Sequence, residues 1–303
     1  VSCRACGHVI KCPHCDVSLS QHGSGAATRL VCHYCGYTTI QPGLCPVCGS
    51  KYISGFKAGT QKIEQVVKAR FPQARVLRMD MDTTRTKDGY EQILSAFSNH
   101  EADILIGTQM IVKGHDFPGV TLVGVLAADL SLYISDYRAS ERTFQLLTQA
   151  AGRAGRGDIP GNVIIQTYDP DHYSITTAKE QNYEAFYGQE IEYRKMMRYP
   201  PVWNMLYILC ASKNEAEASE AAVALMGKID QIVRENSEKI FPIGPSDAPV
   251  AKISDVYRKV IYVKTREYQT LVILKDGLEA FIKDNRLYQN VAVGFDFNPV
   301  NGF

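Results

Sequence analysis

The central part of the chain alternates between short apolar runs and segments in which apolar residues recur at helical spacing. The apolar runs predict four strands, at 75–79, 103–106, 121–128 and 162–167. The periodic segments predict three helices, at 60–71, 89–97 and 138–152. Continuously apolar strands between amphipathic helices are typical of a parallel sheet covered on both faces. We therefore expect functional groups at the carboxyl ends of these strands, where Thr108 and Asp129 lie.

Two of these helices have a well-defined apolar face. Thr60 is the expected N-cap of helix 60–71, and the inward residues of that helix are Ile63, Val66, Val67 and Phe71. In helix 138–152 the inward residues are Phe144, Leu147, Ala150 and Ala151. The run 80–85 is interpreted as a strand-to-helix turn with capping hydroxyl groups rather than as a metal site.

A different order of elements begins after a long helix expected over 173–198, which the pair Pro200-Pro201 ends. Strands are predicted at 205–211, 239–244, 258–264 and 291–296, and helices at 215–233 and 268–283. The order βαββαβ predicts a ferredoxin-like sandwich. Its basic residues, near Tyr257 and Tyr262, are Lys252, Arg258, Lys259, Lys264 and Arg266. They either contact DNA backbone or bases, or belong to an ordinary solvated sheet face.

Length and composition fit two or three domains with real cores, because the 303 residues are 45% apolar with a net charge of only +1. We expect a cysteine module at 1–57, an α/β domain at 58–201 and an α+β domain at 202–303.

No signal peptide or long apolar run is visible, so we expect a soluble, cytoplasmic protein without a membrane partner. The chain begins with Val1 rather than a start methionine, which we interpret as a fragment of a longer protein.

Eight of the nine cysteines form four C-x-x-C pairs, and two such pairs can hold one tetrahedral zinc ion. The sequence therefore predicts two structural zinc sites, closed by four thiolates each. We expect a nested arrangement, with Cys12, Cys15, Cys32 and Cys35 in one site and Cys3, Cys6, Cys45 and Cys48 in the other. Sequential pairing and disulfides are the alternatives. The ninth cysteine, Cys210, lies in an apolar strand and is expected to be a small buried filler.

Two dense motifs flank the strand at 121–128: GTQMIVKGHDFP at 107–118 and QAAGRAGRG at 149–157. Phosphoryl transfer builds negative charge on phosphate oxygens, and Arg153 and Arg156 after Gln149 could stabilise it. The alternative is a basic, glycine-rich helix terminus. Lys113 could meet a phosphate or be a solvated loop lysine. Asp116 could orient the arginines, bind a ribose or form a turn.

No phosphate-binding loop of the form GxxxxGK[ST] and no DEAD-like or DEAH-like motif occurs in the chain. The arginine motif therefore predicts one half of a nucleotide site, with the other half upstream of Val1. We expect the chain by itself to hydrolyse no ATP.

The chain closely resembles the C-terminal portion of the primosomal protein N′ (PriA) family of replication restart helicases. The resemblance rests on CRACGHVIKCPHC, CHYCGY, CPVCGS, GTQKIEQ, DMDTTRTK, ILIGTQMIVKGHDFP, DYRASERTFQLLTQAAGRAGRG and IGPSDAPVAKISDVYRKVIYVK. The segments LSLYISDYR and FDFNPVNGF depart from the family pattern.

The resemblance implies a RecA-like second lobe of a superfamily 2 helicase, two zinc ions, and a C-terminal domain similar to a small ribosomal subunit protein that binds fork DNA. It implies that Gln149, Arg153 and Arg156 form motif VI, with Arg156 as the arginine finger. It implies that Thr108, Lys113 and Asp116 belong to motif V, which couples DNA to the nucleotide.

In the full-length protein the resemblance implies ATP and magnesium, forked and single-stranded DNA, and 3′–5′ unwinding at stalled or repaired forks. The implied protein partners are the single-stranded DNA-binding protein, through its acidic tail, and the primosome proteins that reload the replicative helicase. We expect a monomer. The alternatives are a non-catalytic scaffold at forks and another zinc-containing superfamily 2 helicase that acts on RNA.

Overall fold

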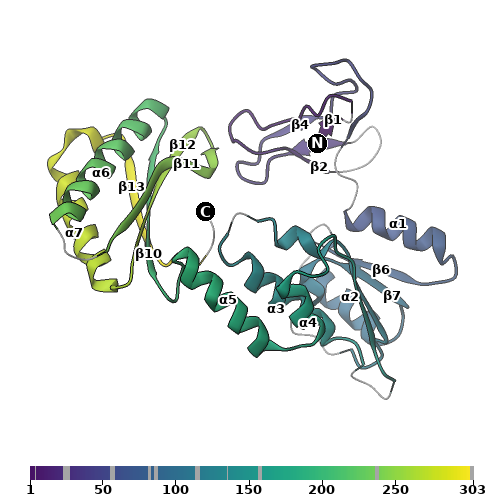
Figure 1. The fold of residues 1–303 in the computed structure, drawn as a ribbon. Coiled ribbons are helices and arrows are strands. Elements are labelled where there is room, and N and C mark those ends of the chain that lie inside the picture. The colour runs from purple at the N-terminus through teal and green to yellow at the C-terminus, as the bar shows by residue number, and fades with distance from the viewer. Residues whose placement is uncertain are drawn as a thin grey trace. The chain divides into compact units, whose positions relative to one another are not determined.

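The computed structural model describes residues 1–303 except 4, 23–27, 55–58, 81–82, 85–87, 113–116, 135, 156–158, 236–238 and 301–303. The chain forms two compact units (Figure 1). Unit 1 comprises Val1–Gly55, Ser135–Tyr137 and Ile191–Phe303, and unit 2 comprises Phe56–Ile134 and Arg138–Glu190. Each unit has hydrophobic clusters of its own.

The N-terminal part of unit 1 is a cysteine module with little regular structure. Its short strands are β1 (Ser2–Cys3), β2 (Ser20–His22), β3 (Arg29–Val31), β4 (Thr38–Ile40) and β5 (Ile53–Ser54). Strands β2, β3 and β4 form an antiparallel sheet, and β1 pairs with β5. The small core consists largely of cysteine side chains around Leu19 and Leu30.

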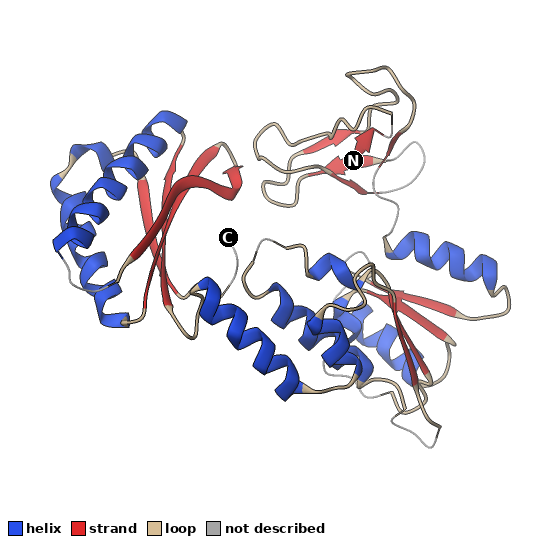
Figure 2. Cartoon of the chain, in the orientation of Figure 1, coloured by secondary structure: helices blue, strands red, loops and turns tan. Residues whose placement is uncertain are grey.

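The C-terminal part of unit 1 has the predicted βαββαβ order. Its elements are β10 (Asn204–Ser212), α6 (Glu215–Glu235), β11 (Phe241–Ile253), β12 (Val256–Thr265), α7 (Tyr268–Asp284), the 3₁₀ turn η4 (Arg286–Tyr288) and β13 (Ala292–Phe297). The antiparallel sheet has the order β11-β12-β10-β13, and both helices cover the same face of it (Figure 2). The core between them includes Leu206, Leu225, Leu274 and Cys210, so the prediction for Cys210 is confirmed.

Unit 2 is the α/β domain. Its elements are α1 (Thr60–Arg70), β6 (Val76–Met79), α2 (Gly89–Ser98), β7 (Ile104–Gly107), η2 (Gln109–Val112), β8 (Leu122–Val125), η3 (Ala128–Ser131), α3 (Ala139–Ala151), β9 (Asn162–Ile165), α4 (Tyr173–Lys179) and α5 (Tyr183–Met197), which continues into unit 1. Strand β6 pairs with β7 and β8 with β9, both in parallel. The predicted parallel pairing is confirmed.

Several local predictions for unit 2 are wrong. Gly59, not Thr60, is the N-cap of α1, and no residue of α1 is buried. Val66 and Phe71 each remain 55% exposed. Leu122 and Ile164 are more than half exposed, so the outer face of the β8–β9 pair is open rather than covered.

The long helix expected over 173–198 is two helices, α4 and α5. The break falls at Gln181, which has a left-handed φ of 52°. Helix α5 ends at Met197, and the next residue, Arg198, again has a positive φ, of 57°. A left-handed residue cannot continue a right-handed helix, so each helix stops there.

Candidate functional site

The structure brings the eight paired cysteines together as two groups of four. Cluster 1 consists of Cys3, Cys6, Cys45 and Cys48, and cluster 2 of Cys12, Cys15, Cys32 and Cys35. Within each group the sulfur atoms all lie within 4.8 Å of one another. These are the groups of the nested arrangement, and all nine cysteines of the chain are free thiols.

Tight turns hold the cysteine pairs. Gly7 and Gly49 follow the second cysteine of the two pairs of cluster 1 and have left-handed φ values of 75° and 69°. Each donates its N–H back to the carbonyl of the first cysteine, at 3.0 and 2.9 Å. Glycine adopts this conformation without steric cost, so the turn can close and direct both sulfur atoms inward.

Hydrogen bonds inside the turns favour thiolates in cluster 1. The backbone N–H of Cys6 is the main cause that lowers the pKa of Cys3 to about 6. The N–H of Cys48 likewise lowers the pKa of Cys45. Because zinc binds thiolate rather than thiol, the lowered pKa values of Cys3 and Cys45 favour metal binding. The four converging sulfur atoms of the cluster fit a tetrahedral zinc ion.

The first motif of unit 2 begins at the carboxyl end of β7. Gly107 is tightly enclosed there, since a Cβ atom on it would lie 2.6 Å from the carbonyl oxygen of Met79 and 2.5 Å from Cγ2 of Ile111. Only glycine fits between β6 and η2 at this point. Thr108 follows and is exposed. Lys113 and Asp116 lie outside the described residues.

The second motif lies at the end of α3. Gln149 is exposed on the last turn of this helix, and Arg153 is half-buried just beyond it. Arg156 lies outside the described residues. Helix α3 packs against both η2 and β8, so the helix that carries Gln149 contacts the element that follows Thr108.

The loop after α3 is anchored by a close backbone approach. Gly155 has a φ of 75° and donates its N–H to the carbonyl of Val120 at 3.0 Å. A Cβ atom on Gly161 would lie only 2.2 Å from the backbone nitrogen of Gly155. Gly155 therefore fixes the backbone of the arginine motif against the residues that precede β8 and β9.

A buried carboxylate joins the ends of β8 and β9. Asp129 accepts hydrogen bonds from Oγ1 of Thr167 at 2.5 Å, from the N–H of Tyr168 at 3.0 Å and from the N–H of Asp169 at 3.3 Å. The Thr167 hydroxyl is the main cause that holds the pKa of Asp129 below its usual value. The sequence placed Asp129 at a strand end but gave no sign of this anchoring role.

Asp80 has a similar role at the end of β6. Its carboxylate accepts a hydrogen bond from Oγ1 of Thr60 at 2.5 Å and lies 3.3 Å from Nε of Arg78. The hydroxyl groups of Thr83 and Thr84 donate to the Asp80 carbonyl. They stabilise this turn rather than cap α2, whose N-cap is Asp88.

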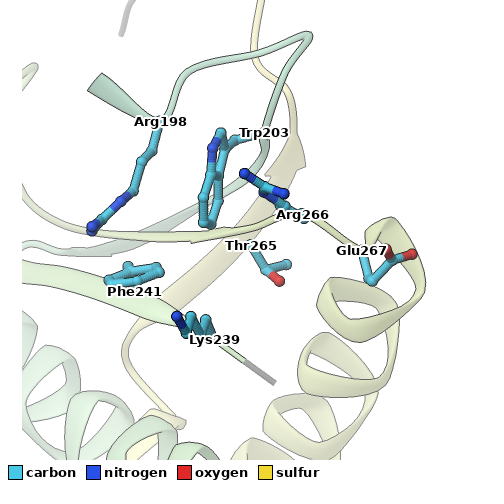
Figure 3. A pocket seen from close by; sticks show the side chains of 7 residues that line it. All are labelled: Arg198, Trp203, Lys239, Phe241, Thr265, Arg266 and Glu267. Atoms are coloured by element: carbon cyan, nitrogen blue, oxygen red, sulfur yellow. The ribbon is translucent and has the colours of Figure 1, made fainter. Parts of the chain in front are cut away.

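A basic pocket lies in the C-terminal domain of unit 1 (Figure 3). It has a volume of about 450 Å³ and is lined by Arg198, Trp203, Lys239, Phe241, Thr265, Arg266 and Glu267. The guanidinium carbon of Arg198 lies 3.6 Å from the Phe241 ring centroid, and that of Arg266 lies 5.4 Å from the Trp203 ring centroid. The pocket combines three cations with one carboxylate, and aromatic rings support its guanidinium groups.

The predicted basic cluster of this domain does not form one open surface. Lys259 lies 2.5 Å from Oδ1 of Asp247 and 3.1 Å from Oε1 of Glu215. Lys264 is buried and donates to the carbonyl of Met197 at 3.1 Å. Arg266 belongs to the pocket instead.

Three family models match successive parts of the chain. Residues 12–39 match the PriA DNA helicase Cys-rich region domain, residues 51–158 the helicase conserved C-terminal domain, and residues 195–300 the primosomal protein N C-terminal domain. The replication restart protein PriA of Bacillus subtilis (strain 168) is 46% identical over 303 residues, which are 99% of this chain and 36% of that relative. The chain belongs to the PriA family.

Other PriA relatives show the same relation. The replication restart protein PriA of Synechocystis is 44% identical over 276 residues, 90% of this chain and 33% of the relative. That of Chlamydia pneumoniae is 41% identical over 268 residues, 88% of this chain and 35% of the relative. The chain thus spans about a third of the length of the curated PriA relatives it matches. The family resemblance and fold class predicted from the sequence are confirmed.

Among the helices that the structure describes, none combines the length and the hydropathy required to span a membrane.

Proposed function

We propose that the chain is the C-terminal part of an ATP-dependent 3′–5′ DNA helicase that restarts replication at stalled or repaired forks. The match of residues 51–158 to the helicase C-terminal domain, within a chain 46% identical to a replication restart protein, carries this proposal. The packing of α3 on η2 supports it, because this packing gathers the two motifs of unit 2 in one part of the domain.

In this proposal the second motif contacts the nucleotide. Arg156 is the arginine finger, and Arg153 and Gln149 complete the same side of the site. Thr108, Lys113 and Asp116 couple nucleotide state to DNA. The phosphate loop and the carboxylate that holds magnesium belong to the rest of the full-length protein.

Each cysteine cluster holds one structural zinc ion in this proposal. Four sulfur ligands leave no open position for water, so the ions stabilise the fold and do not act on substrate. The cysteine module has little apolar core of its own, so metal binding supplies much of its folding free energy.

The basic pocket is the proposed contact to DNA phosphates in the C-terminal domain, because Arg198, Lys239 and Arg266 present three cations around one cavity. Forked and single-stranded DNA are the proposed substrates.

The proposed protein partners are the single-stranded DNA-binding protein and the helicase-loading proteins. We propose that the protein is a monomer and acts in the cytoplasm.

The test is ATP turnover by the full-length protein with forked DNA, single-stranded DNA or RNA of equal length. We expect strong stimulation by forked and single-stranded DNA and little by RNA. Stimulation by RNA alone would favour the RNA helicase alternative. Fork binding without any stimulated turnover would favour a non-catalytic scaffold.

A further inference from the structure

The tip of the β11–β12 hairpin, residues 252–255, lies against the turn of cluster 2 formed by residues 12–16. Three hydrogen bonds donated by backbone N–H groups join them. The N–H of Ser254 donates to Sγ of Cys15 at 3.2 Å, and the N–H of Asp255 donates to the carbonyl of His14 at 2.9 Å. The N–H of Asp16 donates to the carbonyl of Lys252 at 2.8 Å. Both segments belong to unit 1.

Side chains of the hairpin tip strengthen the same contact. Nζ of Lys252 donates to the carbonyl of Pro13 at 2.8 Å. Oδ2 of Asp255 lies 2.7 Å from Nδ1 of His14. Ile253 packs against the small core that cluster 2 shares with Leu19 and Leu30. Polar and apolar contacts therefore converge on one metal-binding turn.

The shape of the tip is specialised for this contact. Ser254 and Asp255 have φ values of 50° and 62°, a pair of left-handed residues of the kind that two-residue hairpin turns require. Glycine, asparagine and aspartate are the usual choices at such positions. The aspartate at 255 also reaches His14 with its carboxylate.

The two clusters differ in which backbone N–H group donates a hydrogen bond to the sulfur of their second cysteine. In cluster 1 the sulfur of Cys6 receives a backbone N–H from His8, two residues further along the same segment. In cluster 2 the sulfur of Cys15 receives its N–H from Ser254, 239 residues away in the sequence. The hairpin thus supplies to cluster 2 the kind of donor that cluster 1 obtains locally.

We propose that the hairpin tip is the outer coordination shell of cluster 2, so that this metal site is shared between the cysteine module and the C-terminal domain. Hydrogen bonds to a metal-bound thiolate stabilise its charge and fix its direction. A metal ion in turn orders the turn that presents Cys15, His14 and Pro13 to the hairpin. Metal binding at cluster 2 and docking of the tip reinforce each other by the same factor. The inference rests on the proposed zinc occupancy and not on helicase activity.

The test measures zinc release from the 303-residue chain to a chromogenic chelator, followed by absorbance. The variant Lys252→Met/Asp255→Gly removes the two polar side chains of the tip that contact the cluster 2 turn, and glycine fits the left-handed backbone at 255. We expect one of the two zinc ions to leave roughly 10- to 100-fold faster than in the wild type. The other ion keeps its wild-type rate.

A matched control keeps the test specific. Lys283→Met/Asp284→Asn changes the same charges at the exposed end of α7 and is expected to have no effect on zinc release. In a Cys15→Ser background only cluster 1 holds metal, and there the Lys252→Met/Asp255→Gly change should leave the release rate unaltered.

Wild-type release of both ions from Lys252→Met/Asp255→Gly would overturn the proposal. Equal acceleration of both ions would also overturn it, since that result indicates general loosening of the module. A metal content below two zinc ions in the wild-type chain would overturn the zinc assignment itself. That last outcome leaves the helicase proposal to be decided by ATP turnover.

Discussion

Arg198 and Arg266 show how single residues prepare the basic pocket. Their guanidinium groups lie over the rings of Phe241 and Trp203. An arginine stacked on a ring keeps its N–H donors in the plane of the guanidinium group, where they remain available to an anion. The rings therefore make cation–π contacts with the arginines rather than stack on nucleic-acid bases.

We expect the salt dependence of DNA binding to report on these arginines. Each phosphate contact contributes roughly 0.9 to the slope of log K against log salt concentration for duplex DNA and about 0.7 for single strands. Arg198→Met/Arg266→Met should make this negative slope shallower by about 1 to 2 units. The slope is measured by fluorescence anisotropy with a labelled oligonucleotide. The control is Arg286→Met, which removes an exposed arginine of the same domain. An unchanged slope in the double variant would remove the pocket from the DNA contact.

Lys264 is an unusual residue, because its amine lies 3.7 Å from the Tyr199 ring centroid and is buried. Burial is the main cause that lowers the pKa of Lys264 to about 8, and repulsion from Arg198 adds to it. In the unfolded chain a lysine titrates near 10.4. Between about pH 8 and 10 the unfolded state therefore binds more protons than the folded state, so the Lys264 contribution to stability rises with pH.

This difference gives a test at the level of one residue. The wild type should gain stability relative to Lys264→Met as the pH rises from 8 to 10. Chemical denaturation monitored by Trp203, the one tryptophan of the chain, measures it. The exposed residue Lys283 provides the control, since Lys283→Met should show no such pH-dependent difference. A constant difference between wild type and Lys264→Met over this range would contradict the lowered pKa.

At the level of elements, the C-terminal domain was the most predictable part of the chain. The predicted helix at 215–233 differs from α6 by two residues at one end. The strand predicted at 239–244 was too short, because β11 extends to Ile253. The break between α4 and α5 had no such signal. Gln181 adopts a left-handed backbone without the glycine or proline that usually marks such a position.

The contacts that complete the sites were the least predictable. Asp129 and Asp80 are short polar residues at strand ends, where turn formation and buried anchoring look the same in sequence. The contact between Ser254 and Cys15 joins segments 239 residues apart. Local patterns predict which residues lie at an edge, but long-range packing decides what they touch.

The close approach of Gly155 and Gly161 gives a prediction for the loop after α3. Gly161→Ala would place Cβ 2.2 Å from the nitrogen of Gly155, so the loop must shift. We expect the local stability of this region to fall by about 1–3 kcal/mol. Hydrogen exchange of the β8 and β9 amides measures this change. Gly188→Ala, in open space on α5, is the control and should leave these amides at least as protected. Equal protection in both variants would contradict the tight glycine contact.

At the level of the whole molecule, we expect the cysteine module to depend on metal, because its core is small. We expect two zinc ions per chain by mass spectrometry under native conditions. Cys45→Ser and Cys15→Ser should each lose one ion, because they belong to different clusters. A count near one in the wild type, or disulfides between the paired cysteines, would contradict the arrangement of two closed sites.

The arginines that follow α3 in the sequence are the residues of unit 2 best suited to contact a nucleotide phosphate. The two motifs of unit 2 occur on elements that pack together, and the chain spans about a third of its PriA relatives. We infer that these arginines complete a nucleotide site whose other residues belong to the rest of the full-length protein. The 303-residue chain alone should therefore show no ATP turnover.

The most direct test is DNA-stimulated ATP hydrolysis by the full-length protein carrying Arg156→Ala. An arginine finger contributes about 10³- to 10⁵-fold to turnover, so we expect a loss of this order while DNA binding is retained. Arg70→Ala, an exposed arginine of α1 in the same unit, should hydrolyse ATP at the wild-type rate. Unchanged turnover in Arg156→Ala would contradict the central claim.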